Sequence, residues 1–333
     1  MFVLCAASYV LLFLVFLKIV SKLTRARCKS KVCLVGKVAL VTGGSSGIGY
    51  EIVLKLASRG CKVIVADKVI DEDIKVKVEK ETNNPNIIFE YVDLASFKSV
   101  RKLTEKINRS EEKLDILINN AGIPRSSEIP TEDGFNPTMQ INYYSHFLLT
   151  HLLVGLLKKS PAARIIFTSS ANAYFHRISP ENIGPLEIKE EKIPLFNYMN
   201  SKFCLVIASD IFADLLKKYN ITSNAFHPGV VRTDIVKKYY QQNLTWWERI
   251  SMPLITLLYL SIGKSPEDGA EIAIHIATSN KMELITGEFF IATVPFIKPR
   301  GTFNNELRDE IWRLSENIVK LTPAEKLKSV GVK

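Results

Sequence analysis

Short apolar runs alternate with segments of helical periodicity along most of the chain. The β-branched runs occupy residues 38–42, 62–66, 87–92, 114–118, 164–168 and 221–226. They lack the polar alternation of a strand with one face in water, as expected when both faces of a sheet are covered. Strands that alternate with helices in this way are typical of a parallel sheet with helices on both faces. The sequence therefore predicts an α/β fold built on a doubly wound parallel sheet.

The length of the chain is compatible with one domain or with two. A chain of 333 residues can bury a full core, either as one large α/β domain or as two smaller ones. It contains no internal repeat and no low-complexity tract. We assign residues 37–333 to a single domain.

The N-terminus is a separate apolar segment. Residues 2–17 carry no charged side chain, and with residues 18–20 they reach the length of a transmembrane helix. A cleaved signal peptide is the alternative, but it would have a basic start and a small-x-small cleavage site. We expect an uncleaved membrane anchor over residues 1–20 and a basic linker over residues 21–36. Positive charge after the anchor places the domain in the cytosol.

A second apolar stretch covers residues 246–262. Glu248, Arg249 and Pro253 interrupt it, so it does not read as a membrane span. It is compatible with a core helix, or with an interfacial or substrate-covering segment. We expect a substrate loop near residues 234–264.

The charge and the cysteine content of the chain indicate which kinds of binding partner and which compartment to expect. Lys and Arg number 44 against 34 Asp and Glu, which gives a net charge of +10. The basic residues that follow the N-terminal segment favour a membrane surface over nucleic acid, since no nucleic-acid motif is present. The five cysteines have neither the spacing of a metal site nor that of a disulfide framework. We expect no metal and a reducing compartment.

A glycine-rich turn follows the first predicted strand. It reads Thr42-Gly43-Gly44-Ser45-Ser46-Gly47-Ile48-Gly49, and a helical pattern begins directly after it. Gly43 allows the tight turn, Gly47 allows close approach of a pyrophosphate, and Gly49 allows the helix to pack on the strand. The next strand ends at Asp67, where a carboxylate can bind a ribose. This βαβ unit predicts a dinucleotide site.

Four further motifs follow predicted strands or open a helix. They are Asn119–Gly122, Ser169-Ser170, Tyr198–Lys202 and His227–Thr233. In an open parallel sheet the loops after the carboxyl ends of the strands converge on one crevice, where ligands bind. We therefore expect these motifs to face one another.

With these residues in this order, the sequence resembles the short-chain dehydrogenase/reductase family over roughly residues 36–295, and the fold is expected to be of the Rossmann type. It is similar to the membrane-anchored retinol dehydrogenase branch through four further segments, which are Gln140–Leu153, Lys264–Ala270, Thr286–Phe290 and Ile311–Ser315. The resemblance implies an NAD(P)-dependent oxidoreductase with the catalytic residues Tyr198, Lys202, Ser170 and Asn142. It implies that the cofactor contacts Thr42, Gly43, Ser45, Ser46, Gly47, Ile48, Gly49, Asp67, Lys68, Asp93, Leu94, Asn120, Ala121, Gly122, Tyr198, Lys202, Pro228, Gly229, Val231 and Thr233.

The chemistry of the catalytic residues is consistent with these roles. Tyr198 and Lys202 lie four positions apart, on one face of a predicted helix. A tyrosine of ordinary pKa, about 10, is a poor base at neutral pH, and a nearby ammonium favours its phenolate. By the family pattern Ser170 binds the substrate oxygen, Ser169 ends a strand, and Asn142 supports a water that links Lys202 to solvent. Asp93 matches the adenine position, although an Asp after a strand can also be a helix cap.

The cofactor signals conflict. The Asp67 carboxylate suits NAD because it repels a 2′-phosphate, whereas the adjacent Lys68 suits NADP. We favour NAD, with NADP possible.

The expected substrate is a lipophilic alcohol or carbonyl, retinoid-like by resemblance, with steroids and fatty or isoprenoid alcohols as alternatives. The expected location is the endoplasmic reticulum or a lipid droplet, and a homodimer is possible. The rival hypothesis is a non-catalytic membrane or lipid-droplet protein that keeps the fold.

Overall fold

The computed structural model describes residues 25–124, 129–179, 195–232 and 263–327, and the single positions 19, 256 and 259. The expected anchor over residues 1–20 lies outside the described residues, apart from Ile19. Thr233 also lies outside them, as does the stretch 246–262 apart from Thr256 and Tyr259. None of the helices in the described parts of the chain has the length and apolarity needed to cross a membrane.

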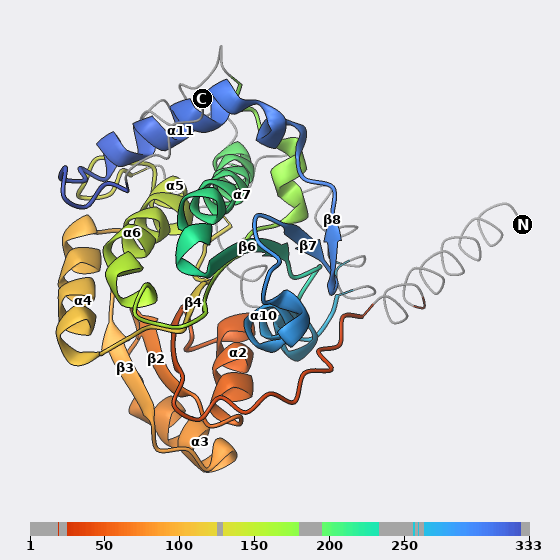
Figure 1. Ribbon diagram of the computed structural model, residues 1–333. Coiled ribbons are helices and arrows are strands. Elements are labelled where there is room, and N and C mark those ends of the chain that lie inside the picture. The colour runs from red at the N-terminus through yellow and green to blue at the C-terminus, as the bar shows by residue number, and fades with distance from the viewer. Residues whose placement is uncertain are drawn as a thin grey trace, which may run out of the picture.

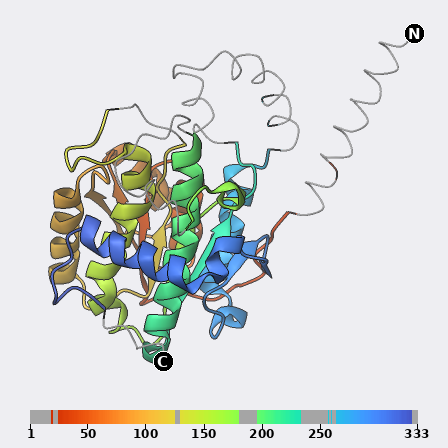
Figure 2. The same cartoon turned by 90° about the horizontal axis from the view of Figure 1, so that it is seen from above.

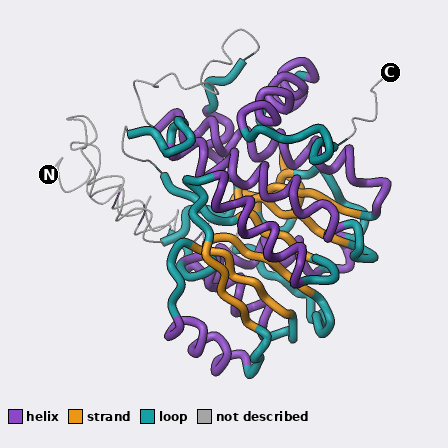
Figure 3. Tube along the Cα trace, turned by 90° about the vertical axis from the view of Figure 1, so that its left-hand side faces the viewer, coloured by secondary structure: helices purple, strands orange, loops and turns teal. Residues whose placement is uncertain are grey.

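An eight-stranded sheet forms the centre of the described protein, in the order β3-β2-β1-β4-β5-β6-β7-β8 (Figures 1 and 3). The first seven strands in this order pair in parallel and β8 is antiparallel to β7. The strands are β1 (Val38–Thr42), β2 (Lys62–Asp67), β3 (Ile87–Tyr91), β4 (Ile116–Asn119), β5 (Ala163–Thr168), β6 (Ile221–His227), β7 (Phe289–Ile291) and β8 (Val294–Phe296). All six strands predicted from the apolar runs are present. The last two were not predicted.

Helices cover both faces of the sheet, which confirms the predicted α/β class. On one face lie α2 (Gly47–Ala57), α3 (Glu72–Thr82) and α10 (Pro266–Thr278). On the other lie α4 (Phe97–Ser110), α6 (Ser145–Leu157) and α7 (Leu195–Leu216), and α6 follows the short helix α5 (Pro137–Met139) and the π-helix η1 (Gln140–Tyr144). The C-terminal helix α11 (Asn305–Ile318) runs across α6 and α7 (Figure 2).

Aromatic packing joins α11 to the layer beneath it. Trp312 lies 4.9 Å from Phe147 and 5.0 Å from Phe212, measured between ring centroids. Its indole N–H donates to Glu316. Because Phe147 and Phe212 are fully buried, α11 completes the core on this face.

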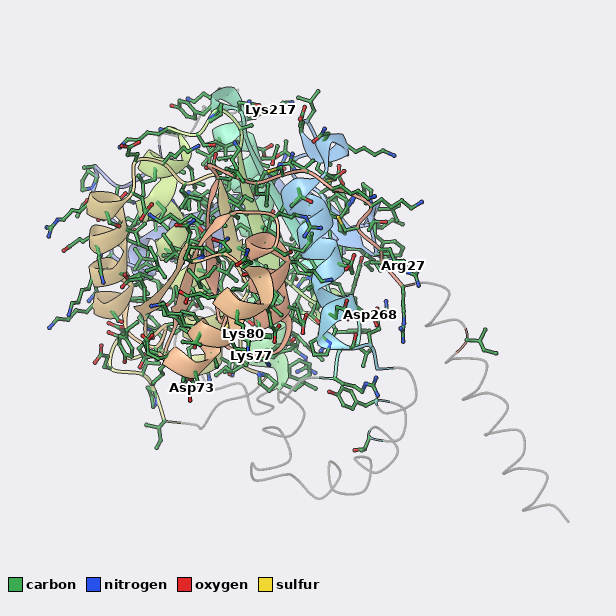
Figure 4. All side chains as sticks on the ribbon, turned by 90° about the horizontal axis from the view of Figure 1, so that it is seen from below. Arg27, Asp73, Lys77, Lys80, Lys217 and Asp268 are labelled. Atoms are coloured by element: carbon green, nitrogen blue, oxygen red, sulfur yellow. The ribbon has the colours of Figure 1, made fainter. Side chains whose placement is uncertain are left out.

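Residues 25–36 lie along α10 and α2. Ala26 and Leu34 are buried, and the Ser30 hydroxyl donates to the carbonyl of Thr278 at 3.0 Å. Arg25 pairs with Asp268 at 3.2 Å, in the first turn of α10, and Figure 4 labels Asp268 near the point where the chain continues toward the N-terminus. These contacts fix where the chain enters the domain, on the side of the sheet where α10 begins.

Candidate active site

The glycine-rich turn joins β1 to α2 and leaves backbone donors exposed. Gly43 and Gly47 have φ values of +65° and +56°, a conformation that favours glycine. Ser46 is the N-cap of α2, but its side chain makes no capping hydrogen bond, and the first turn holds no acidic residue. Backbone N–H groups at a helix N-terminus, together with the helix dipole, bind anions such as a pyrophosphate.

Packing at Gly49 brings α2 against the end of β1. A Cβ atom at this position would lie 2.0 Å from the Gly43 carbonyl oxygen and 2.7 Å from the Asn120 side-chain nitrogen. No side chain fits in that space. The glycine that the motif places here is therefore required by close approach of backbone to backbone.

The loop after β4 is tied to the end of β1. The Thr42 hydroxyl accepts the backbone N–H groups of Asn120 at 2.8 Å and of Ala121 at 3.0 Å. The Asn120 amide donates to the Thr42 carbonyl at 3.0 Å. These bonds place Asn120, Ala121 and Gly122 beside the glycine-rich turn.

Asp67 and Lys68 end β2, next to the same turn. The Asp67 carboxylate accepts the backbone N–H of Ser45 at 3.0 Å and that of Lys68 at 2.7 Å. The Lys68 ammonium lies 2.6 Å from the carboxylate of Asp93, which is the residue expected at the adenine position. Lys68 therefore has a carboxylate partner within the protein, and Asp67 remains the acidic group at the end of β2.

These elements enclose a cavity of about 410 Å³ at the carboxyl ends of the strands. Its walls include these predicted site residues: Gly43, Ser46, Gly47, Ile48, Gly49, Asp67, Lys68, Asp93, Leu94, Asn120, Ala121, Gly122, Tyr198, Lys202 and Pro228. Sequence reasoning did not assign Ala66, Val69, Val92, Ile123, Ile141 and Thr168 to the site, although they also line the cavity. Most of them adjoin a predicted strand end or motif, which is a signal that could have found them. The uncapped N-terminus of α2 and the Asp67 carboxylate both line this cavity, and these are the two kinds of group that a dinucleotide needs for its pyrophosphate and its ribose.

Four residues that were predicted to contact the cofactor do not line the cavity. Thr42 is buried, and its hydroxyl accepts from the backbone of the loop after β4. The Ser45 hydroxyl donates to the carbonyl of Val69. Gly229 has a φ of +91°, and Val231 is buried and forms a β-bridge with Lys264.

Two of the catalytic candidates, Tyr198 and Lys202, line this cavity. The Ser170 hydroxyl hydrogen-bonds the Tyr198 phenol. The Lys202 ammonium lies 5.6 Å from the centre of the Tyr198 ring and donates to the Thr168 carbonyl at 2.8 Å. The Ser169 hydroxyl instead donates to the Lys202 carbonyl at 2.6 Å, so it anchors α7 to the end of β5. The two adjacent serines thus face different partners.

Asn142 connects the segment around Tyr198 to the loop after β4. It lies in the π-helix η1, and its side chain both donates to and accepts from the backbone of Ile123, at 2.9 and 2.8 Å. It also donates to the Ser201 hydroxyl at 3.1 Å, which in turn donates to the Tyr198 carbonyl at 2.8 Å. Single π turns of this kind are frequent at functional sites. The structure brings all four expected catalytic residues together.

Burial shifts the pKa values of both central groups. Burial raises the pKa of the Tyr198 phenol, and the hydrogen bond from Ser170 lowers it by less. Burial also lowers the pKa of Lys202 to about 7. In the protein without its cofactor, desolvation therefore has the largest effect on the pKa of the Tyr198 phenol.

Comparisons with known proteins agree with this geometry. Residues 37–180 match the family described as short chain dehydrogenase. The chain is 33% identical to retinol dehydrogenase 13 of Mus musculus, over 89% of this chain and 88% of that protein. It is also 33% identical to polyprenol dehydrogenase of Homo sapiens, with 84% of each covered. A solved short chain dehydrogenase from Shigella flexneri complexed with NADP has a TM-score of 0.59 and 23% identity, and covers 78% of this chain and 98% of that one.

Proposed function

The chain belongs to the short-chain dehydrogenase/reductase family, and from that premise we propose that it interconverts a lipophilic alcohol and its carbonyl compound with a nicotinamide dinucleotide. One observation carries this proposal. Ser170, Tyr198 and Lys202 lie together, and Tyr198 and Lys202 line a cavity whose other walls fit a dinucleotide.

The residues divide the chemistry between them. A bound nicotinamide supplies hydride acceptance in the direction of oxidation. The Ser170 hydroxyl holds the substrate oxygen beside Tyr198, and the Tyr198 oxygen takes the hydroxyl proton. Lys202 carries positive charge near this phenol and so favours its ionised form, and the positive charge of an oxidised nicotinamide acts in the same direction. In the direction of reduction Tyr198 returns the proton to the carbonyl oxygen.

For the cofactor we propose a preference for NAD. Asp67 places a carboxylate at the end of β2, where it can accept from ribose hydroxyls and repel a 2′-phosphate. The cation beside it, Lys68, pairs with Asp93 at 2.6 Å. A 2′-phosphate would therefore meet the repulsion of Asp67 and would compete with Asp93 for the Lys68 ammonium. The solved short chain dehydrogenase from Shigella flexneri, which is similar in fold, is complexed with NADP, so both cofactors belong in the test.

For the substrate we propose a retinoid-like or polyprenol-like alcohol, as the printed names of the relatives suggest. A lipophilic substrate partitions into membranes, and residues 2–17 carry no charge. We place an anchor over residues 1–20 and the enzyme on the cytosolic face of the endoplasmic reticulum or a lipid droplet. Residues 25–36 would then hold the domain at a fixed point relative to that anchor, because they pack along α10.

The experiment is a cofactor and substrate panel with two tyrosine variants. The purified protein is assayed with NAD and NADP against retinol, a polyprenol, a steroid alcohol and a short alcohol. We expect Tyr198→Phe to lose turnover while still binding the dinucleotide, since only the proton-transferring oxygen is removed. Tyr174→Phe is the matched control, because the Tyr174 hydroxyl donates to the carbonyl of Ile297 instead. Rapid turnover by Tyr198→Phe, or equal losses in both variants, would refute the mechanism.

A further inference from the structure

His146 lies in the first turn of α6, four residues after Asn142, and its side chain is fully buried. Its Nδ1 atom is 2.9 Å from the carbonyl oxygen of Asn142, and its Nε2 atom is 2.9 Å from the hydroxyl of Thr42. Thr42 ends β1, and Asn142 lies in the π-helix. One imidazole therefore bridges the end of β1 and the π-helix η1.

The partners determine which nitrogen of His146 carries the proton. A carbonyl oxygen only accepts, so Nδ1 must be the N–H that bonds Asn142. The Thr42 hydroxyl already accepts two backbone N–H groups, those of Asn120 and Ala121. Both of its lone pairs are used, so its own proton is donated. Nε2 of His146 at 2.9 Å is a nearer acceptor for this proton than the carbonyl oxygen of Ile118 at 3.5 Å. Burial lowers the pKa of His146 to about 4, which is consistent with this neutral form.

These bonds close a ring around the loop after β4. Thr42 holds the start of the loop through Asn120 and Ala121. Asn142 holds its end through both backbone groups of Ile123. His146 joins Thr42 to Asn142 and so links the two fixed ends of the segment that lines the cavity. A ring in which every donor has an acceptor is more rigid than its bonds taken separately.

We propose that His146 is a positioning residue that holds the loop of residues 120–123 against the cofactor and, through Asn142, aligns that loop with Tyr198 and Lys202. This role rests on the function proposed above. His146 touches neither cofactor nor substrate and acts through Thr42 and Asn142. Without it, the Thr42 hydroxyl would lose the nearer of its two acceptors and keep only the Ile118 carbonyl at 3.5 Å, and the loop would lose the link between its two ends.

His151 provides a matched control on the same helix. Its Nδ1 atom lies 3.0 Å from the carbonyl of Phe147, four residues earlier, which is the same local bond that His146 makes. Burial also lowers its pKa to about 4. Its Nε2 atom has no hydrogen-bond partner, and its ring packs against Phe147, Phe212 and Trp312. Replacing each histidine by Phe therefore removes similar local bonds, and only His146→Phe opens the ring.

The test measures hydrogen–deuterium exchange without cofactor, so its result does not depend on turnover. In His146→Phe we expect amide exchange over residues 119–124 to be about ten-fold faster than in the parent, as for the loss of one buried hydrogen bond. Exchange in β3 serves as the reference for any global loss of stability. His151→Phe should leave the ratio of loop to β3 exchange unchanged. An unchanged ratio in His146→Phe, or the same change in both variants, would overturn the proposal.

A second measurement asks whether His146 acts through Thr42. Exchange over the same loop is compared in Thr42→Val, His146→Phe and the double variant. If the ring exists, the double variant should exchange no more than about two-fold faster than Thr42→Val, because the same link is already broken. If the two single substitutions instead multiply each other's effect on the exchange rate, the proposal is overturned.

If His146→Phe does not fold, His146→Gln takes its place in both measurements. Its amide oxygen can reach Thr42, so we expect an exchange rate between those of the parent and of Thr42→Val, and a rate as fast as Thr42→Val would overturn the proposal.

Titration of each variant with NADH, followed by quenching of protein fluorescence, then connects the loop to binding. We expect the Kd to rise about ten-fold in His146→Phe and to stay unchanged in His151→Phe. Faster loop exchange with an unchanged Kd would overturn the part of the proposal that concerns the cofactor. A parent protein that binds NADH but oxidises no alcohol would instead contradict the proposed function and leave the exchange result standing.

Discussion

Replacing Gly49 or Gly155 by alanine should change the free energy of unfolding in opposite directions. Both are helical glycines, in α2 and α6. An alanine methyl at position 49 would lie 2.0 Å from the Gly43 carbonyl oxygen and 2.7 Å from the Asn120 side-chain nitrogen. At position 155 nothing lies within 4 Å of the new methyl. One substitution therefore forces the glycine-rich turn apart, and the other only adds a methyl group to an exposed helix surface.

The magnitudes follow from these contacts. Overpacking a rigid site costs about 1–3 kcal/mol. Displacing the Asn120 amide, which donates to the Thr42 carbonyl, adds about 1–3 kcal/mol. We therefore expect Gly49→Ala to lower the free energy of unfolding by about 3–5 kcal/mol and to weaken NADH binding. Gly155→Ala should raise the free energy of unfolding by about 0.5–1 kcal/mol, since alanine favours a helix over glycine.

The assay is urea denaturation monitored by circular dichroism, with NADH titration of each folded variant. A loss of stability in Gly49→Ala should also appear as a fall in Tm of about 10 °C. If Gly49→Ala is as stable as the parent and binds NADH with the same Kd, then α2 does not pack on the end of β1 as the structure shows. A loss in Gly155→Ala similar to that in Gly49→Ala would refute the steric reasoning.

Three further predictions concern the cofactor, pH and the membrane. Asp67→Ala, with Lys68 retained, should raise kcat/KM for NADP relative to NAD by at least about ten-fold, and equal use of both cofactors by the parent and the variant would show that the site is misassigned. The free energy of unfolding should fall as pH decreases from about 6.5 to 4, because the unfolded chain then binds protons that three histidines with a pKa of about 4 exclude in the folded chain. These are the buried His146 and His151 and the half-buried His227. His151→Phe should reduce that loss by about 3 kcal/mol in urea titrations at pH 7 and pH 4, and an unchanged loss would contradict the assignment. Deletion of residues 1–20 should weaken membrane attachment and leave activity on detergent-dispersed substrate. If the truncated protein stays on membranes through alkaline carbonate washing, a second integral segment is indicated, for which residues 246–262 are the candidate.

The fold could be predicted where the apolar pattern is long and regular. Each of the six predicted runs forms a strand, because a strand buried on both faces needs a continuous apolar sequence. The strands β7 and β8 have three residues each, and Pro295 lies within β8. Such short runs do not stand out from a loop, and only pairing with β6 makes β7 part of the sheet. The π-helix η1 was missed for a related reason, since its sequence continues the helical pattern of α6.

The position of a site residue could be predicted more readily than the direction of its side chain. Parallel strands bring their carboxyl ends to one edge, so the sequence order of the motifs was enough to gather Gly47, Asn120, Ser170 and Tyr198. Side-chain partners depend instead on contacts between distant segments. Lys68 pairs with Asp93 at the end of a different strand, which no local pattern indicates.

His146 and His151 show where this limit lies. Both occur in the segment that resembles retinol dehydrogenases, both are buried on α6, and both bond the carbonyl four residues earlier. Their local sequence environments therefore predict the same structural role. What separates them is Thr42, 104 positions before His146, which β1 brings to its Nε2 atom, whereas α11 brings Trp312 to the ring of His151. A histidine within an apolar helix can thus be assigned to the core or to the active site only when the partner of its second nitrogen is known.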